Sequence, residues 1–304
     1  MKKAMCWAQR LVFLLCLLLL RPAAAEEVKA EHQGLEVIGN LDIAPGKTLK
    51  ADGVVLLLHD TLGHHRVELM AALQELLHER GINSLAITLS LGLNARRGMF
   101  DCGIEQDHRT EDAREELGTW INWLREKGAG SIVLAGHGRG GVQVALYITQ
   151  NPDKLIRKAV LIAPLAHSVG SAGSEYDERF RRPLEPVLAE AEKLKADDQS
   201  SMLMSNVGFL LCPQARVTAG SFINYYGQNP NLYTPGLVPN IKLPTLIAVG
   251  DQDPLGAELS AAIQGIPTGT SHVTFAMVPG ADHLFRDLAA DSLANRIKAF
   301  VQQK

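Results

Sequence analysis

The stretch Ser131–Gly141, SIVLAGHGRGG, decides how the rest of the chain is interpreted. Residues 131–135 form a short apolar run, which predicts a buried strand. The segment 136–141, GHGRGG, predicts a tight turn, and the mostly apolar segment 142–149, VQVALYIT, predicts a helix. Small residues are needed in such a turn because it is strained and because strand and helix almost touch.

A strand, a glycine-rich turn and a buried helix form the frame of a nucleophile elbow, G-x-S-x-G, which displays a serine at the tip of the turn. In this sequence the tip is Gly138. The turn is also unlike a phosphate-binding loop, because it lacks the Lys-Ser/Thr pair and the G-x-G-x-x-G spacing. The sequence therefore predicts the support for a nucleophile without the nucleophile itself.

Apolar runs and amphipathic segments alternate on both sides of this stretch. We predict strands at 35–43, 53–59, 83–89, 131–135, 156–163, 245–249 and 273–278, and helices at 67–80, from Thr110 to just before Gly128, and at 142–149, 186–197, 255–264 and 287–301. Residues 27–33 are predicted to be a loose polar segment. The alternation predicts an α/β fold with a mostly parallel central sheet and helices on both faces.

The alternation of predicted strands and helices is interrupted at 165–240. This segment contains a Gly/Ser-rich piece at 168–174, a charged helix and a group of aromatic residues. We interpret this segment as an inserted lid or cap; ordinary loops and helices packed beside the sheet are the alternative. Its aromatic residues suggest a partly apolar ligand, although Phe222, Tyr225 and Tyr226 are equally suited to a core. The predicted organisation is a signal peptide at 1–25, core at 26–164, insertion at 165–240 and core again at 241–304.

Residues 1–25 read as a secretory signal, with Lys2 and Lys3, an apolar run at 11–20 and small residues at Ala23–Ala25. Export to the periplasm or medium is expected; an uncleaved N-terminal anchor is the alternative, although the run is short for a membrane span. The chain has 30 Lys and Arg against 33 Asp and Glu, and four of the basic residues lie in 1–25. The remaining 26 against 33 give a net charge of −7, which argues against a nucleic-acid partner.

Cys102 and Cys212 are the cysteines that remain after removal of the signal. Two cysteines in an oxidising compartment predict one disulfide, and two separate buried thiols are the alternative. No cluster has diagnostic metal-ligand spacing, so no metal is predicted, and no organic cofactor is implied. Binding of a ligand or a metal by the histidines near the predicted mouth of the site is the alternative to the interpretation that follows. His59, His64 and His65 are interpreted as loop residues.

Four landmarks follow one another at predicted strand ends. They are LHDT at 58–61, GHGRG at 136–140, GDQDP at 250–254 and GADH at 280–283. In this order the pattern resembles the α/β-hydrolase superfamily, in an esterase- or lipase-like form, over roughly residues 53 to 301. The resemblance implies a hydrolase-type pocket for a small-molecule or ester-like substrate.

The resemblance also assigns roles to particular residues. It places Asp253 as the acid and His283 as the base, since a carboxylate fixes the imidazole tautomer and stabilises the imidazolium. It implies an oxyanion hole from the backbone N–H groups of Thr61 and Arg139. His137, one residue before the tip, is expected to point away from His283.

Two residues depart from the family pattern. Gly138 removes the nucleophile, and Asp60 replaces the usual glycine beside the oxyanion hole. We therefore expect a pseudo-hydrolase that keeps a small-molecule pocket. One alternative is an enzyme in which His283 and Asp253 act as a general base on water or on a C–H bond. A further alternative is an ordinary serine-dependent esterase in which Gly138 replaces the serine.

Overall fold

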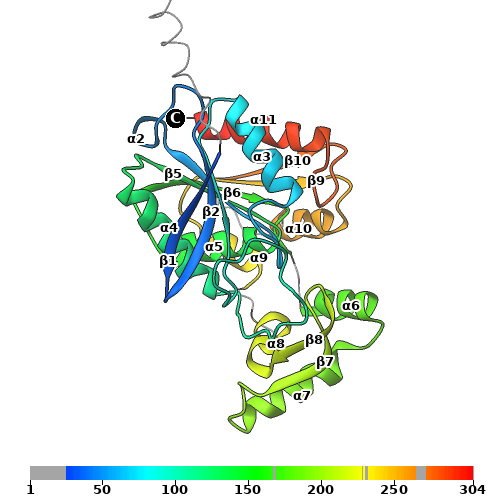
Figure 1. The fold of residues 1–304 in the computed structure, drawn as a ribbon. Helices are drawn as coiled ribbons and strands as arrows, with labels where there is room; N and C mark the ends of the chain where they lie inside the picture. The colour runs from blue at the N-terminus through cyan, green and yellow to red at the C-terminus, as the bar shows by residue number, and fades with distance from the viewer. Residues whose placement is uncertain (1–24, 167–168, 228, 230–231, 265–271, 304) are drawn as a thin grey trace, which may run out of the picture.

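The computed structural model describes residues 25–166, 169–227, 229, 232–264 and 272–303 (Figure 1). Residues 1–24 of the predicted signal peptide lie outside the described residues. The strands are β1 (Glu26–His32), β2 (Leu35–Asp42), β3 (Val54–Leu58), β4 (Ser84–Thr88), β5 (Ile132–His137), β6 (Ile156–Ile162), β7 (Leu203–Phe209), β8 (Cys212–Thr218), β9 (Thr245–Gly250) and β10 (Val273–Val278). The helices are α2 (Leu49–Asp52), α3 (Glu68–Glu79), α4 (Asp112–Glu126), α5 (Arg139–Gln150), α6 (Val169–Phe180), α7 (Leu184–Ala196), α8 (Ala219–Tyr226), α9 (Thr234–Leu237), the 3₁₀ turn η2 (Val238–Asn240), α10 (Pro254–Gln264) and α11 (Leu288–Gln302).

The central sheet has eight strands in the order β1-β2-β4-β3-β5-β6-β9-β10. The pairs β1–β2 and β2–β4 are antiparallel, and every other pair is parallel. The predicted mostly parallel sheet is therefore confirmed. Because parallel strands end at one edge, the loops after β3, β5, β9 and β10 meet on the same side of the sheet.

Both faces of the sheet are buried, which explains why β3 reads as a continuous apolar run. Side chains alternate along a strand, so Leu56 and Leu58 pack on the side of α4 and α5, while Val55 and Leu57 pack on the side of α3 and α11. Figure 1 shows these helices on opposite faces of the sheet. Among the described residues, no helix is long and apolar enough to cross a membrane.

One predicted feature of secondary structure was wrong, and two elements were not predicted. Residues 27–32 are not loose, because they belong to β1, which pairs with β2 from Glu26↔Leu41 to His32↔Leu35. The polarity of β1 reflects its place at the sheet edge, where side chains stay partly exposed. Helix α6 begins inside the Gly/Ser-rich piece, and the β7–β8 hairpin was not predicted.

The segment from α6 to α8 forms a second small unit beside the sheet, below it in Figure 1. It has its own buried cluster, which includes Phe209 and Phe222 with no measurable exposure. The predicted disulfide joins Cys102 in the long loop after β4 to Cys212 at the start of β8, with a Cα–Cα distance of 5.4 Å. This bond ties the unit to the core; a lid function for 165–240 stays a prediction.

Candidate functional site

The turn between β5 and α5 has the geometry of an elbow. Gly138 adopts φ +53° and ψ −118°, and its N–H donates to the carbonyl of Ile162 at 2.9 Å. Gly136 must be glycine, because a Cβ on it would lie 2.2 Å from the backbone oxygen of Gly140. The turn is therefore rich in glycine because the strand and the helix approach each other closely there.

The predicted acid and base lie together. Nδ1 of His283, in the loop after β10, is 2.9 Å from Oδ2 of Asp253, which precedes α10. The carboxylate is buried, and its Oδ1 accepts the backbone N–H of Leu255 at 3.0 Å. His283 Nδ1 thus donates to Asp253, and its Nε2 faces the elbow.

Asp60, at the end of β3, fills the space that the elbow leaves above Gly138. A Cβ added to Gly138 would lie 2.2 Å from both Cγ and Oδ1 of Asp60, a distance that real Cβ atoms do not show. Oδ1 of Asp60 accepts the backbone N–H of Arg139 at 2.7 Å and the hydroxyl of Thr61 at 3.1 Å. Oδ2 lies 3.5 Å from Nε2 of His283.

Both residues predicted to form the oxyanion hole contact the Asp60 carboxylate, Arg139 through its backbone N–H and Thr61 through its side-chain hydroxyl. The backbone N–H of Arg139 is bound to Asp60, and the Thr61 hydroxyl also accepts from Nε of Arg139 at 3.3 Å. The sequence identified Asp60 as a departure from the family pattern but did not place it against Arg139. The pairing uses the backbone amide of Arg139, which no side-chain pattern reveals.

His283 lies between two carboxylates, and this determines its charge. Burial alone would lower its pKa, but hydrogen bonding to Asp253 and Asp60, together with their negative charges, raises the pKa of His283 to about 10. In the opposite direction, burial would raise the pKa of Asp60, but His283, the charge of His137 and the Arg139 amide together lower it well below its usual range. These directions favour a protonated His283 beside an ionised Asp60.

The expectation for His137 was wrong. Its Nε2 donates to the backbone oxygen of His283 at 2.8 Å, and the two rings lie 4.9 Å apart. The loop after β10 crosses the end of β5 at this point, which the strand alone cannot indicate. His59 and His65 are both buried. The ring of His59 is hydrogen-bonded to the backbone oxygen of Asp60, and the ring of His65 to the hydroxyl of Thr88.

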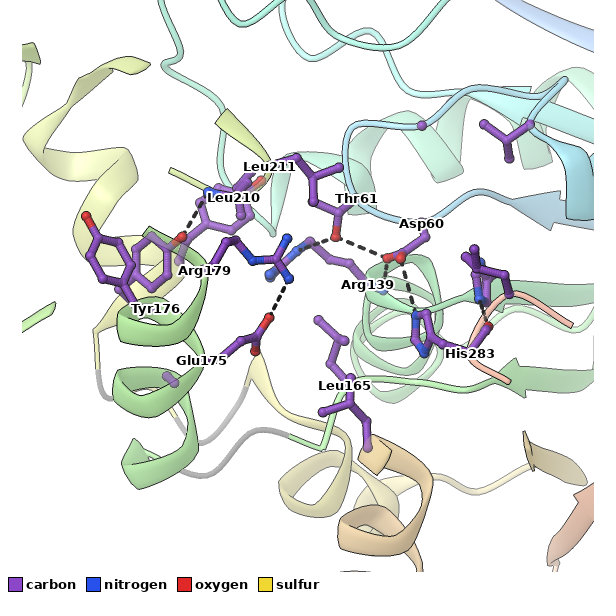
Figure 2. Close-up of a pocket in the computed structure, with 18 of the residues that line it drawn as sticks. Asp60, Thr61, Arg139, Leu165, Glu175, Tyr176, Arg179, Leu210, Leu211 and His283 are labelled. Atoms are coloured by element: carbon purple, nitrogen blue, oxygen red, sulfur yellow. Dashed lines mark hydrogen bonds and ion pairs between the residues drawn. The ribbon is translucent and has the colours of Figure 1, made fainter. Parts of the chain in front are cut away.

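A cavity of about 480 Å³ opens above this site, within the size range of small-molecule pockets. Figure 2 shows Asp60, Arg139 and His283 on one side of it and α6 with Glu175, Tyr176 and Arg179 on the other. Tyr225, Tyr226 and Tyr233 also line it, while Phe222 lies in the core of the small unit.

Sequence reasoning missed the α6 residues because it placed no helix at Val169–Phe180 and noted only a Gly/Ser-rich piece at 168–174. The available signal was the i,i+4 spacing of Glu175 and Arg179, which form an ion pair at 2.9 Å. Within the described part of the chain, no group of His, Cys, Asp or Glu side chains is arranged to hold a metal ion.

Comparisons with known proteins agree with this geometry. The model of the Alpha/beta hydrolase family matches residues 55–296. Similar solved structures include Est1E from Butyrivibrio proteoclasticus (16% identity, 90% of this chain and 96% of that chain, TM-score 0.62). An esterase from Pyrococcus furiosus gives 15% identity over 92% of this chain and 90% of that chain, TM-score 0.60. A monoacylglycerol lipase from Paleococcus ferrophilus gives 19% identity over 88% and 98%, TM-score 0.59.

A search of curated protein sequences gave no significant match. The solved structures are similar in fold at low identity, whereas the family model covers most of the chain. With the elbow after β5 and the acid and histidine after β9 and β10, the match leads to one conclusion. The chain belongs to the α/β-hydrolase family.

Proposed function

We propose that this protein is an exported, small-molecule-binding member of the α/β-hydrolase family that does not hydrolyse esters by a serine mechanism. The observation that carries the proposal is the position of the Asp60 carboxylate. It occupies the place where a side chain on Gly138 would begin, and it accepts the Arg139 amide that would otherwise stabilise an oxyanion. A substrate oxyanion would have to compete with a carboxylate of the protein.

General-base catalysis by His283 is the weaker candidate. A base must be unprotonated to accept a proton, and the pKa of His283 is raised to about 10 by hydrogen bonds to Asp253 and Asp60 that outweigh its burial. While Asp60 is ionised, His283 stays protonated at neutral pH. Its hydrogen bond to Asp253 then holds an imidazolium in place rather than preparing a base.

The interpretation of Gly138 as a replaced serine is also weaker. A serine there would meet Asp60 at an impossible distance, so Asp60 would have to rotate away from the Arg139 amide. Gly138 and Asp60 instead fit each other as a pair. The cavity of about 480 Å³ beside this pair supports binding of a small molecule, and the signal-like segment 1–25 supports export.

Esterase assays with short and medium acyl esters test the proposal. Four proteins are compared: wild type, Gly138→Ser, Asp60→Gly/Gly138→Ser, and the last variant with His283→Ala added. We expect wild type and Gly138→Ser to be inactive, because the first lacks a nucleophile and the second places it against Asp60. The double variant gains a nucleophile, space and a free oxyanion donor, so it should show hydrolysis that the added His283→Ala abolishes.

Two outcomes would contradict the proposal. If the wild type hydrolyses esters, the single variant His283→Ala is assayed as well, and loss of hydrolysis in that variant would establish an enzyme that needs no serine. Activity in Gly138→Ser equal to that of the double variant would mean that Asp60 does not block the site, which would favour a serine hydrolase that has lost its serine.

A further inference from the structure

The half-buried guanidinium of Arg139 faces the cavity, and it forms no ion pair with any acidic side chain in the described part of the chain. Its Nε donates to the Thr61 hydroxyl at 3.3 Å, and its Cζ lies 4.8 Å from the ring centroid of Tyr225. These two contacts fix the plane of the guanidinium. Among the residues that the structure describes, its two Nη atoms have no hydrogen-bond partner. A cation that is partly removed from water is stabilised by an anion that takes the place of the lost water.

Arg179 enters the cavity from the opposite wall. Figure 2 shows its side chain on α6 pointing toward that of Arg139 on α5. Arg179 forms an ion pair with Glu175 of the same helix, and 41% of its side chain remains accessible to solvent. The other charged groups of the lining do not neutralise Arg139, because Asp60 is paired with His283 and Glu68 is exposed at the first turn of α3.

The rest of the cavity is suited to an apolar chain or ring. Its wall includes aliphatic side chains from both the core and the small unit, namely Leu165, Leu210, Leu211, Leu232, Leu255 and Leu284. A ligand with an anionic head at Arg139 would place its tail along this wall. A neutral ester or alcohol would fill the wall equally well but would leave the guanidinium without a counter-charge.

We propose that the cavity binds an amphipathic carboxylic acid, with its carboxylate on Arg139, supported by Arg179, and its apolar tail along the leucine wall. This inference rests on the proposed function and adds the class of ligand. A planar guanidinium suits a carboxylate because it can offer two parallel N–H donors to the two oxygens. Its fixed position over Tyr225 means that less freedom is lost on binding.

Isothermal titration with matched acids and alcohols tests the proposal. The probes are octanoate against octan-1-ol and 3-phenylpropanoate against 3-phenylpropan-1-ol, at pH 7.5. We expect each acid to bind at least about tenfold more tightly than its alcohol, as a charge-assisted hydrogen bond implies. Comparison of the two acids shows whether the tail is an alkyl chain or an aromatic ring.

Three variants separate charge from packing. Arg139→Gln should weaken acid binding by about 10- to 100-fold and leave alcohol binding unchanged. Arg179→Gln should produce a smaller loss, since this side chain is exposed and shared with Glu175. Arg216→Gln is the control, because Arg216 pairs with Glu105 on the surface and does not line the cavity. Unchanged alcohol binding in Arg139→Gln also shows that the cavity is still folded.

Equal affinity for acid and alcohol, or equal loss of both in Arg139→Gln, would overturn recognition of the carboxylate but leave a small-molecule pocket intact. Absence of binding for all four probes would overturn the assignment of the ligand class. The ester assays described above then decide separately whether the proposed function holds.

Discussion

Replacing Asp60 with Asn removes one of the two negative charges that hold His283 as an imidazolium, while keeping the size of the side chain. In the wild type the pKa of His283 is raised to about 10, because contacts with Asp253 and Asp60 outweigh the effect of burial. In the variant only the contact with Asp253 remains to oppose the effect of burial. We therefore expect the pKa of His283 to fall in Asp60→Asn.

The size of the fall follows from the distance between the two groups. Oδ2 of Asp60 lies 3.5 Å from Nε2 of His283. Two unit charges at this separation interact with about 1 kcal/mol in a water-like dielectric and about 5 kcal/mol at an effective dielectric near 20. Roughly a quarter of each side chain is accessible, so the pair lies between these limits. The pKa of His283 should therefore fall by about 1 to 3.

The same change alters how stability depends on pH. The folded-state pKa of His283 lies above its ordinary value near 6.5, so its contribution to stability is complete below pH 6.5 and is lost as the pH rises to about 10. In Asp60→Asn this contribution is smaller and is lost at lower pH. The free energy of unfolding of the wild type should therefore fall more steeply between pH 6.5 and 10 than that of the variant.

Nitrogen NMR titration of the histidine rings measures the pKa directly, and urea unfolding at several pH values measures the linked stability. Asp251→Asn is the control, because Asp251 lies in the same loop as Asp253 but is exposed and accepts the backbone N–H of Gly280 instead. A change of less than about half a unit in the pKa of His283 in Asp60→Asn would refute the ion-pair argument. An equal change in the control would also refute it.

Three further predictions concern the scaffold. Gly136→Ala should destabilise the protein by at least about 2 kcal/mol in urea unfolding, since its Cβ would meet the Gly140 backbone. The matched control is Gly118→Ala in α4, where the nearest atom to the added Cβ is 3.8 Å away. This variant should stabilise the protein by about 0.5 to 1 kcal/mol. Denatured, unreduced protein should show no free thiol, and a free thiol in the wild type would contradict the disulfide. Cys102→Ser should lower the free energy of unfolding by about 2 to 4 kcal/mol, because it opens a loop of 110 residues. N-terminal sequencing of exported protein should begin near Glu26, and an intact Met1 would contradict removal of the signal.

Much of the scaffold could be predicted because its signals are local. The strand at Val54–Leu58 and the helix at Glu68–Glu79 were located to within about one residue at each end, since apolar runs and helical periodicity are properties of short windows. The edge strand Glu26–His32 was missed because its polar side chains carry a weak alternation. The β7–β8 hairpin was missed because its hydrophobic positions face a small unit whose existence only the fold reveals.

The candidate site divides in the same way. The resemblance to the α/β-hydrolase superfamily, carried by the order of the landmarks, selected Asp253 and His283 as partners, and the parallel strands bring the loops that hold them to one edge of the sheet. The order of the landmarks was also enough to expose the missing nucleophile at Gly138. The direction of His137 and the pairing of Arg139 were not available from spacing, since both depend on a loop that arrives from a distant part of the chain.

The sequence by itself determined the α/β architecture, the empty elbow and the acid–histidine pair, because each depends on residue type and order. Only the tertiary structure decided that Asp60 occupies the elbow, that His283 is held between two carboxylates and that Arg139 faces a cavity beside α6. The physical reason is that charge and access depend on distances of a few ångströms between segments far apart in the chain. Such distances are set by the packing of the whole molecule, and no local pattern encodes them.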